Sequence, residues 1–439
     1  MVKRLLISLL LIVIFVAAVT FGATMLFKSD YSTLQSIQAE EAAEAPSPSQ
    51  LPTLTPETVS EQSGGSVNPE GSFGDFTAPA DVAQPMTADS SLTQAKGIVS
   101  AMTLQEKVCQ MFFVTPEELT GYSKVTQSGD VTRTSYEEYP VGGVVYFGTN
   151  LVTTNQTTEM IANIQQFARE RSGFGLFIGV DEEGGSVARL ADNLGTAAFD
   201  DMAAYGEEGD SAKAYEIGSA IAADMQALGF NVDFAPCADV LTNEDNTVVQ
   251  RRSFGSDPEL VSQFVSQEVS AFVTSGILCA PKHFPGHGST GGDTHDGYAS
   301  SDLNRMDLES CDLKPFQAAI DAGAPMIMVG HMTFPNIDRE HPASLSSVLI
   351  TDVLRNQMGY DGIIITDAMN MGAITQNYTS GEAAVAAIQA GCDMILCTPN
   401  LENAVDAVLQ AVEDGEISRV SIDESVVRII AAKLQYGVG

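Results

Sequence analysis

Short apolar runs alternate with longer amphipathic stretches from about residue 92 to residue 439. Apolar runs of this length, bounded by polar or turn-forming residues, predict buried strands. Eight such runs occur, at 109–114, 143–147, 176–180, 232–236, 277–281, 325–330, 362–366 and 393–397. Helix-length segments lie between them, for example at 155–171, 212–228, 258–275, 309–322, 346–358 and 381–390. Near-continuous apolar strands separated by helices indicate a parallel sheet covered on both faces.

This repeated order of strand and helix predicts an α/β fold. Eight such units in roughly 350 residues are typical of a (β/α)8 TIM-type barrel, which we expect as a single domain over residues 92–439. A doubly wound open sheet is the main alternative. The first predicted strand is not followed by GxGxxG, and the chain has no GxxxxGK followed by Ser or Thr. The sequence therefore does not support a nucleotide-binding fold.

The N-terminal part of the chain has a different pattern. Residues 5–27 carry no charge, and basic residues stand on both sides of this run. A run of this length can span a bilayer and is long for a cleaved signal peptide, so we expect a transmembrane signal anchor at 1–28. A cleaved signal and a buried core helix are the alternatives. Residues 29–91, rich in Pro, Ser, Thr, Glu, Ala and Gln, predict a disordered linker.

Charge and cysteine usage narrow the possible partners and compartment. Acidic residues outnumber basic ones 57 to 21, which gives a net charge of -36 and argues against nucleic-acid binding. The basic flank of the apolar run predicts that the following domain lies outside the cytosol, anchored to the membrane or secreted after cleavage. An exported protein can form disulfides. Because the six cysteines show no compact framework spacing, we expect mostly free, buried thiols.

Ionisable residues stand directly after four of the predicted strands. In a (β/α)8 barrel the chemistry lies at the C-terminal ends of the strands, so these positions are candidates for a site. They are Asp181 after the third run, Lys282 and His283 after the fifth, His331 after the sixth and Asp367 after the seventh. A carboxylate at the end of a buried strand is costly unless it is paired or functional. Asp367 is therefore expected to be a nucleophile or a metal ligand, with a helix cap as the alternative.

The segment 282–296 concentrates histidine. Three of the five histidines, His283, His287 and His295, fall within 13 residues, and Asp293 lies two residues before the last of them. A carboxylate this near can orient an imidazole and hold its pKa in the range useful for proton transfer. A metal site built from these four residues is the main alternative, although their spacing matches no common zinc pattern. An ordinary polar loop is the second alternative.

Two further segments offer groups that can bind a polar ligand. Asp181 and Arg189 flank a Glu-Gly-Gly stretch whose glycines allow close approach of the backbone to a ligand. Asp181 can accept hydrogen bonds from hydroxyl groups. Arg252 belongs to an Arg-Arg pair and offers a donor fork for a hydroxyl, acetamido or carboxylate group. A surface ion pair is the alternative role for Arg252.

With these segments assembled, the chain resembles glycoside hydrolase family 3, in its β-N-acetylhexosaminidase branch. The resemblance covers roughly 95–439. The matching segments are AspGluGluGlyGly…ArgLeu (181–190), ArgSerPheGly (252–255), LysHisPheProGlyHisGly (282–288), AspThrHis (293–295), GlyHisMet (330–332) and ThrAspAlaMetAsnMet (366–371). The chain departs from the family pattern at Ser186, where relatives often carry Arg, and at Ala368, which replaces a frequent second Asp. These departures leave the aglycone side open.

The resemblance implies a retaining two-step mechanism with Asp367 as the nucleophile and His295, supported by Asp293, as the acid/base. Most family members take a Glu from a second domain for this step. The chain ends at Gly439, shortly after the eighth unit, so we expect no such domain here. The resemblance also assigns sugar binding to Asp181, Arg189, Arg252, Lys282 and His283.

The function expected from this resemblance is that of a retaining, exo-acting β-N-acetylglucosaminidase. It would remove terminal GlcNAc from glycosides such as peptidoglycan fragments, as a monomer and without a cofactor or metal. Phosphorolysis is one alternative, because a neutral histidine repels phosphate less than a carboxylate would. Three more functions stay open: another β-glycosidase of the same family, a metal-dependent hydrolase, and a catalytically silent sugar-binding wall protein.

Overall fold

The structure is a computed structural model that describes residues 88–294 and 297–438. The expected signal anchor, and the expected linker as far as residue 87, lie outside these residues. The first described helix, α2 (Ala88–Ala101), begins four residues before the boundary expected at residue 92. None of the helices in the described ranges has the length and apolar character needed to cross a bilayer.

Eight parallel strands form the centre of the described unit, and each lies within one of the eight predicted apolar runs or continues it. They are β1 (Phe112–Val114), β2 (Gly143–Val145), β3 (Phe177–Val180), β6 (Val232–Asp233), β7 (Leu278–Cys279), β8 (Met326–Val329), β9 (Ile363–Ala368) and β10 (Met394–Leu396). Their order in the sheet is β7-β6-β3-β2-β1-β10-β9-β8. Apart from β7 and β8, which lie at the two ends of this order, each strand of the sheet pairs with its neighbours, and β1 pairs with β10 as a barrel requires.

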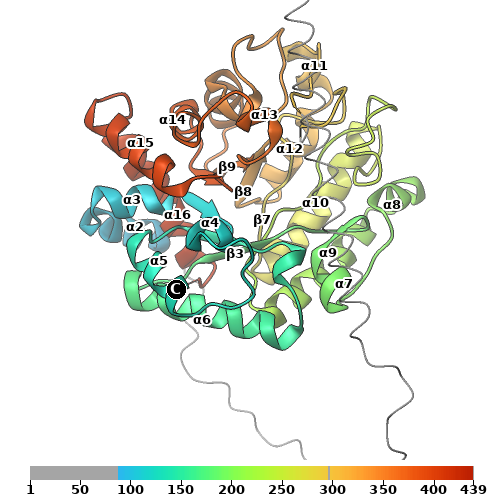
Figure 1. Cartoon of the computed structure of the whole chain (residues 1–439). Helices are drawn as coiled ribbons and strands as arrows, with labels where there is room; N and C mark the ends of the chain where they lie inside the picture. Colours follow the sequence, from blue (N-terminus) through green and yellow to red (C-terminus); the bar gives the residue numbers. More distant parts are fainter. Residues whose placement is uncertain (1–87, 295–296, 439) are drawn as a thin grey trace, which may run out of the picture. The chain divides into compact units, whose positions relative to one another are not determined.

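The segment that follows β7 brings the two ends of this sheet together. The Met328 amide donates to the Pro281 carbonyl at 3.0 Å, and the Phe284 amide donates to the Met328 carbonyl at 2.8 Å. Phe284 also forms a parallel bridge with Val329. The sheet thus curves into a nearly closed (β/α)8 barrel, and the open-sheet alternative is wrong. Figure 1 shows the strands at the centre of the described unit with helices around them.

Large aromatic side chains fill the space between the first strands of the barrel. Phe113 lies on β1, and its ring centroid is 5.3 Å from that of Phe234 and 6.4 Å from that of Phe177. A Cβ at Gly143 or at Gly179 would come as close as 2.7 Å or 2.8 Å, respectively, to the ring of Phe113. The two glycines therefore make room for Phe113, as close packing of a core requires.

Helices cover the outside of the barrel. The longer ones are α6 (Thr154–Ser172), α9 (Ala212–Leu228), α10 (Pro258–Ser275), α12 (Leu313–Asp321), the π-helix η3 (Val348–Gln357), α14 (Ser380–Ala390), α15 (Leu401–Glu413) and α16 (Arg419–Gln435). Other helices around the barrel are α3 (Leu104–Gln110), α4 (Pro116–Thr120), α5 (Asp130–Glu138), α7 (Arg189–Leu194), α8 (Met202–Glu208), α11 (Arg305–Ser310) and α13 (Gly372–Thr375). The small hairpin of β4 (Glu182–Gly184) and β5 (Val187–Ala188) follows β3.

Two predicted boundaries were wrong. The first apolar run begins inside α3, because Thr103 and Glu106 form a capping box that starts this helix at Leu104, and the helix continues to Gln110. The predicted helix 309–322 is two helices, α11 and α12, because Asn304 caps the first helix early and the chain turns at Cys311. Both errors arise at helix ends, where capping rather than periodicity decides the boundary.

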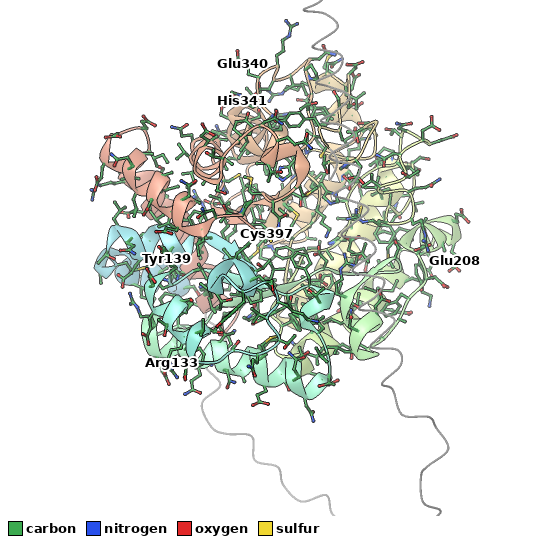
Figure 2. The ribbon with its side chains drawn as sticks, in the orientation of Figure 1. Arg133, Tyr139, Glu208, Glu340, His341 and Cys397 are labelled. Atoms are coloured by element: carbon green, nitrogen blue, oxygen red, sulfur yellow. The ribbon has the colours of Figure 1, made fainter. Side chains whose placement is uncertain are left out.

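All six cysteines are free, as the sequence indicates, and five of them are buried. In Figure 2, Cys397 lies among the central strands, whereas Arg133, Glu208 and His341 lie at the periphery. Burial in apolar surroundings disfavours the thiolate, which is the reactive form of cysteine. Burial accordingly raises the pKa of Cys109 to about 12. These buried thiols therefore behave as small apolar side chains of the core.

Asp393, just before β10, joins three other elements to the barrel through its buried carboxylate. It accepts hydrogen bonds from Arg355 at 2.7 Å, Arg428 at 3.1 Å, Ser425 at 2.7 Å and the amide of Ile364 at 2.9 Å. These partners belong to η3, α16 and β9. Removing one side of a buried ion pair leaves the other charge uncompensated. Asp393 therefore contributes strongly to the packing of η3 and α16 against the barrel.

We expect Asp393→Ala to lower the free energy of unfolding by about 3–5 kcal/mol, because both arginines lose their buried counter-charge. Urea denaturation at pH 7 measures the change. Glu216→Ala is the matched control: Glu216 pairs with Lys213 at 2.8 Å on an exposed helix surface, and its loss should cost under about 1 kcal/mol. Similar small losses in both variants would contradict this account of Asp393.

Lys433, on α16, is a buried cation that pairs with no carboxylate in the described part of the chain. Its ammonium donates to the side-chain oxygen of Gln110 at 2.9 Å and lies 5.1 Å from the ring centroids of Phe174 and Phe177. Burial lowers the pKa of Lys433 to about 7. Because an amide and two rings replace little of the lost hydration, the charged form is disfavoured in the folded protein.

Between about pH 7 and the ordinary lysine pKa of 10.5, the unfolded chain binds more protons at Lys433 than the folded chain. The contribution of Lys433 to the free energy of unfolding therefore rises with pH across that window and does not change with pH below it. Lys433→Met removes the titration. We expect the variant to be more stable than the parent at pH 7, and its advantage to shrink by up to about 1.4 kcal/mol per pH unit towards pH 9. Urea denaturation of both proteins at pH 7, 8 and 9 measures this, and a constant difference would refute it.

Candidate active site

A cavity of about 290 Å³ opens at the C-terminal ends of the strands. Phe147, Val248, Met371 and Leu396 contribute to its apolar part. Six residues that the sequence singles out as candidates line the same cavity: Asp181, Arg189, Arg252, Lys282, His283 and Asp367. The barrel thus brings together side chains from four segments that are far apart in the chain.

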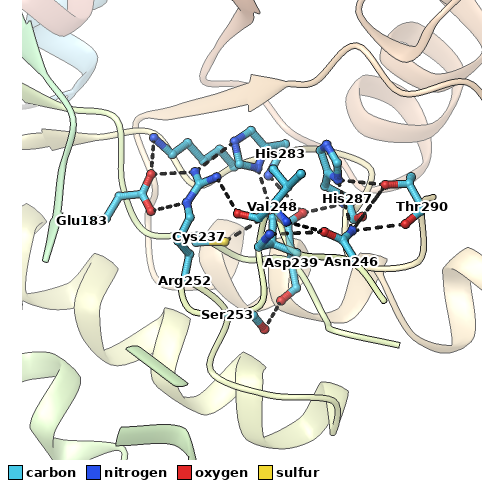
Figure 3. Close-up of polar contacts among 12 residues, drawn as sticks. Glu183, Cys237, Asp239, Asn246, Val248, Arg252, Ser253, His283, His287 and Thr290 are labelled. Atoms are coloured by element: carbon cyan, nitrogen blue, oxygen red, sulfur yellow. Dashed lines mark hydrogen bonds and ion pairs between the residues drawn. The ribbon is translucent and has the colours of Figure 1, made fainter. Parts of the chain in front are cut away.

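A single buried carboxylate holds two cations of this cavity. The ammonium of Lys282 is 2.6 Å from Asp181 Oδ1 and 2.6 Å from Glu183 Oε1. The guanidinium of Arg252 grips Glu183 with two bonds, of 2.8 Å from Nε and 2.7 Å from Nη2 (Figure 3). Although burial favours the neutral acid, the charges of Arg252 and Lys282 hold the pKa of Glu183 below its usual range. Both cations are therefore fixed in place before any ligand arrives.

These contacts correct one alternative and reveal one residue that sequence reasoning missed. Arg252 is in an ion pair, but the pair is buried rather than on the surface: its side chain is 15% exposed and that of Glu183 is 2% exposed. Glu183 lies within one of the segments that carry the family resemblance, yet no feature of the sequence pattern indicated its role. Only its distant partner residues, Arg252 and Lys282, distinguish it from its neighbour Glu182.

Glu182 and Glu183 serve different purposes on the β4–β5 hairpin. The Glu182 carboxylate accepts hydrogen bonds from the amides of Leu190 at 2.6 Å and Ala191 at 3.1 Å. It thereby supports the start of α7, the helix that carries Arg189 as its first residue. Burial raises the pKa of Glu182 to about 7 in spite of these two bonds. Glu182 is therefore a structural support for the segment that brings Arg189 to the cavity.

His283 is oriented by a second buried carboxylate, Asp239. The Nδ1 atom of His283 lies 2.7 Å from Asp239 Oδ2, while Asp239 Oδ1 accepts the His287 amide at 2.6 Å and the His283 amide at 3.3 Å. Burial alone would raise the pKa of Asp239, but the charge of His283 and these bonds lower it below its usual range. A carboxylate can only accept, so Nδ1 carries the proton and Nε2 lies 3.3 Å from Arg252 Nη2.

Sequence reasoning also missed Asp239, for a physical reason. The predicted strand ends at Pro236, so Asp239 lies three residues beyond the strand end, outside the positions searched for polar side chains. The chain continues along the barrel past this point, as the parallel bridge between Cys237 and Lys282 shows. A search of three or four residues beyond each apolar run would have found Asp239.

Asp367 lies near the end of β9 and lines the same cavity. Its Oδ1 accepts the amide of Ala368 at 2.7 Å. His331, after β8, supports this peptide: its Nε2 is 3.0 Å from the Ala368 carbonyl and its Nδ1 is 2.7 Å from the Ser344 hydroxyl. Burial raises the pKa of Asp367, but the charges of His331, His283 and Lys282 outweigh it and hold the pKa below its usual range. Asp367 is therefore ionised, as a nucleophile must be.

The loop expected to carry the acid/base reaches the same cavity. His295 lies outside the described residues, while Asp293 is described and partly buried. Thr294, between them, lines the cavity together with Asp367. Its carbonyl accepts the amide of Ala373 in α13 at 3.1 Å. The loop is thus docked on the segment that follows Asp367, and the placement of His295 opposite Asp367 stays a prediction.

One group of potential metal ligands lies in the described part of the chain, and it differs from the set that the sequence suggests. The ligand atoms of Cys237, Asp239 and His283 lie within 4.8 Å of one another. Cys237 donates its thiol proton to Asp239 Oδ2 at 3.2 Å, the same oxygen that accepts from His283. Burial raises the pKa of Cys237 well above its usual value. Protons therefore already join these three side chains, which explains the cluster without a metal.

Comparisons with known proteins point to one family. The family model described as "Glycosyl hydrolase family 3 N terminal domain" matches residues 103–432. The chain is 33% identical to "Beta-hexosaminidase A" of Pseudoalteromonas piscicida over 320 residues, which are 67% of this chain and 53% of that protein. It is 35% identical to "Beta-hexosaminidase" of Chromobacterium violaceum over 277 residues, which are 62% of this chain and 75% of that protein.

A solved structure gives the same result. The chain matches a glycoside hydrolase family 3 β-N-acetylglucosaminidase from Paenibacillus sp. str. FPU-7 with a TM-score of 0.73 and 38% identity, over 77% of this chain and 63% of that one. The chain thus spans about half the length of the Pseudoalteromonas protein and under two thirds of the Paenibacillus chain. Since the family model covers most of the barrel, this chain belongs to glycosyl hydrolase family 3.

Proposed function

We propose that this chain is a retaining, exo-acting β-N-acetylglucosaminidase that removes terminal β-linked GlcNAc from glycosides. The observation that carries the proposal is the ionised Asp367 in one small cavity with a fixed set of charged groups, Arg252, Lys282 and Asp181. Relatives named β-hexosaminidase and a β-N-acetylglucosaminidase of similar structure support the choice of an aminosugar.

Two displacements at the anomeric carbon give hydrolysis with retention. Asp367 attacks this carbon and forms a glycosyl ester, while His295 donates its proton to the leaving oxygen. His295 then takes a proton from water, whose oxygen attacks the same carbon and releases Asp367 as a carboxylate. Two inversions give net retention. Asp293, two residues before His295, orients the imidazole for both proton transfers.

The polar wall of the cavity suits a single terminal sugar. Lys282 and Asp181, joined at 2.6 Å, can donate to and accept from sugar hydroxyls, as can the His283 ring beside Arg252. Arg189 adds a further donor fork at the cavity wall. A volume of about 290 Å³ supports binding of one sugar unit and therefore exo action.

The expected N-terminal anchor supports a location outside the cytosol. We therefore propose GlcNAc-containing cell-wall fragments as the natural substrates. The chain would act there as a monomer held to the membrane through its N-terminal segment, or as a secreted protein if that segment is cleaved.

The decisive test compares two chromogenic substrates. We expect the full chain to hydrolyse 4-nitrophenyl N-acetyl-β-glucosaminide and to act poorly on 4-nitrophenyl β-glucoside. Asp367→Ala should lower kcat/KM on the first substrate by at least about 10⁴-fold, because no nucleophile remains. The matched control is Asp361→Ala, an exposed aspartate just before β9, which should keep full activity. Full activity in Asp367→Ala would end the nucleophile assignment. Identification of the sugar product with and without phosphate separates hydrolysis from phosphorolysis.

A second prediction concerns the acid step. His295→Ala should slow glycosides with poor leaving groups by about 10²–10⁴-fold, because these need a proton at the leaving oxygen. Aryl glycosides with good leaving groups should lose less. A series of aryl N-acetyl-β-glucosaminides of increasing phenol pKa measures the difference. His341→Ala, on a partly exposed histidine near Asp338, serves as the control. Equal losses across the series would argue against an acid role for His295.

A further inference from the structure

His287 is a buried histidine of the cavity wall. It has no role in the mechanism proposed for Asp367 and His295. It lines the cavity with Asp367 and His283, and the whole residue is 2% exposed. Its Nε2 atom is fully buried and has no hydrogen-bond partner among the described residues. The His287 ring packs edge-on against the His283 ring, with the centroids 5.8 Å apart. An unsatisfied buried nitrogen in a binding cavity is costly unless a ligand completes it.

The opposite side of the ring fixes which nitrogen carries the proton. The Thr290 hydroxyl lies 2.8 Å from His287 Nδ1 and 2.8 Å from the His287 carbonyl oxygen (Figure 3). Two oxygens at this separation need a proton between them, and only the hydroxyl can supply it. Nδ1 must therefore donate to Thr290 Oγ1. Asn246 donates to the same carbonyl at 2.8 Å and holds the turn.

This arrangement leaves His287 Nε2 as a bare acceptor in a neutral ring. Burial lowers the pKa of His287, and the charge of His283 lowers it further, against smaller opposing effects that include Asp367. A neutral imidazole with Nδ1 protonated presents a lone pair at Nε2. The group that this nitrogen can bind must therefore be an N–H or O–H donor.

We propose that His287 Nε2 accepts a hydrogen bond from the acetamido N–H at C2 of the bound aminosugar. The assignment rests on the proposed function, in which Asp367 attacks C1. The two neighbours of C1 in the ring are the ring oxygen, which has no proton, and C2, which carries the acetamido group. Because His287 packs against His283 and lines the same cavity as Asp367, we place its Nε2 near C1, where the sugar offers one N–H donor. The sugar hydroxyls that are farther from C1 bind to Lys282 and Asp181.

The test is a comparison of two substrates in His287→Phe, which keeps a ring against His283 and removes the acceptor. We expect kcat/KM on 4-nitrophenyl N-acetyl-β-glucosaminide to fall by about 10–100-fold, because the acetamido N–H loses its partner. On 4-nitrophenyl 2-deoxy-β-glucoside, which lacks that N–H, the loss should stay within about threefold. Equal losses on both substrates, or no loss on the acetamido substrate, would overturn the proposal.

Thr290→Val keeps the proposal testable if His287→Phe does not fold. Valine removes the group that holds the Nδ1 proton, so the ring can place its proton on Nε2 and become a donor. The same selective loss on the acetamido substrate is expected, with Thr290→Ser as the control that keeps the hydroxyl and the activity. Equal losses on both substrates would overturn the assignment here too. Hydrolysis of the acetamido substrate by the parent protein shows separately that the proposed function stands.

Discussion

The carboxylate of Glu183 is the contact on which the rest of the site depends. It lies between the ammonium of Lys282, at 2.6 Å, and the guanidinium of Arg252, at 2.7 Å, and its side chain is 2% exposed. Two buried cations side by side would repel each other in a medium of low dielectric. Glu183 offsets one of the two charges, and Asp181 contacts Lys282 as a second carboxylate. The cavity thus keeps fixed donors in place without a large uncompensated charge.

Asp239 likewise holds the two histidines His283 and His287 in place. One of its oxygens orients the His283 side chain, and the other holds the backbone of His283 and His287. The consequence is that three residues of one loop, Lys282, His283 and His287, enter the cavity in a defined geometry. A preorganised polar wall stabilises charge that develops during reaction without the cost of rearranging at that moment.

The same surroundings lower the pKa of Asp367, the nucleophile in the proposed mechanism. Asp367 stands at the end of a strand whose apolar residues are part of the core, so its burial favours the neutral acid. The positive side chains around it, and the amide of Ala368, reverse that preference. His331 also acts at one remove, because it binds the carbonyl of the residue that follows Asp367. Strand ends in a barrel concentrate such groups, which explains why this face carries the site.

The sequence by itself determined the eight strands, the parallel barrel and the candidate residues at strand ends. A strand that is buried on both faces needs apolar side chains on both, so it is visible as a continuous apolar run. It also showed Asp181, Lys282, His283 and Asp367 as outliers to that pattern. Only the tertiary structure decided the pairings of Arg252 with Glu183 across 69 residues and of His283 with Asp239 across 44. Helix ends such as that of α3 were decided by local capping bonds. Such pairings depend on distances between side chains that are far apart in the chain. The pattern of apolar and polar residues along the sequence contains no information on these distances.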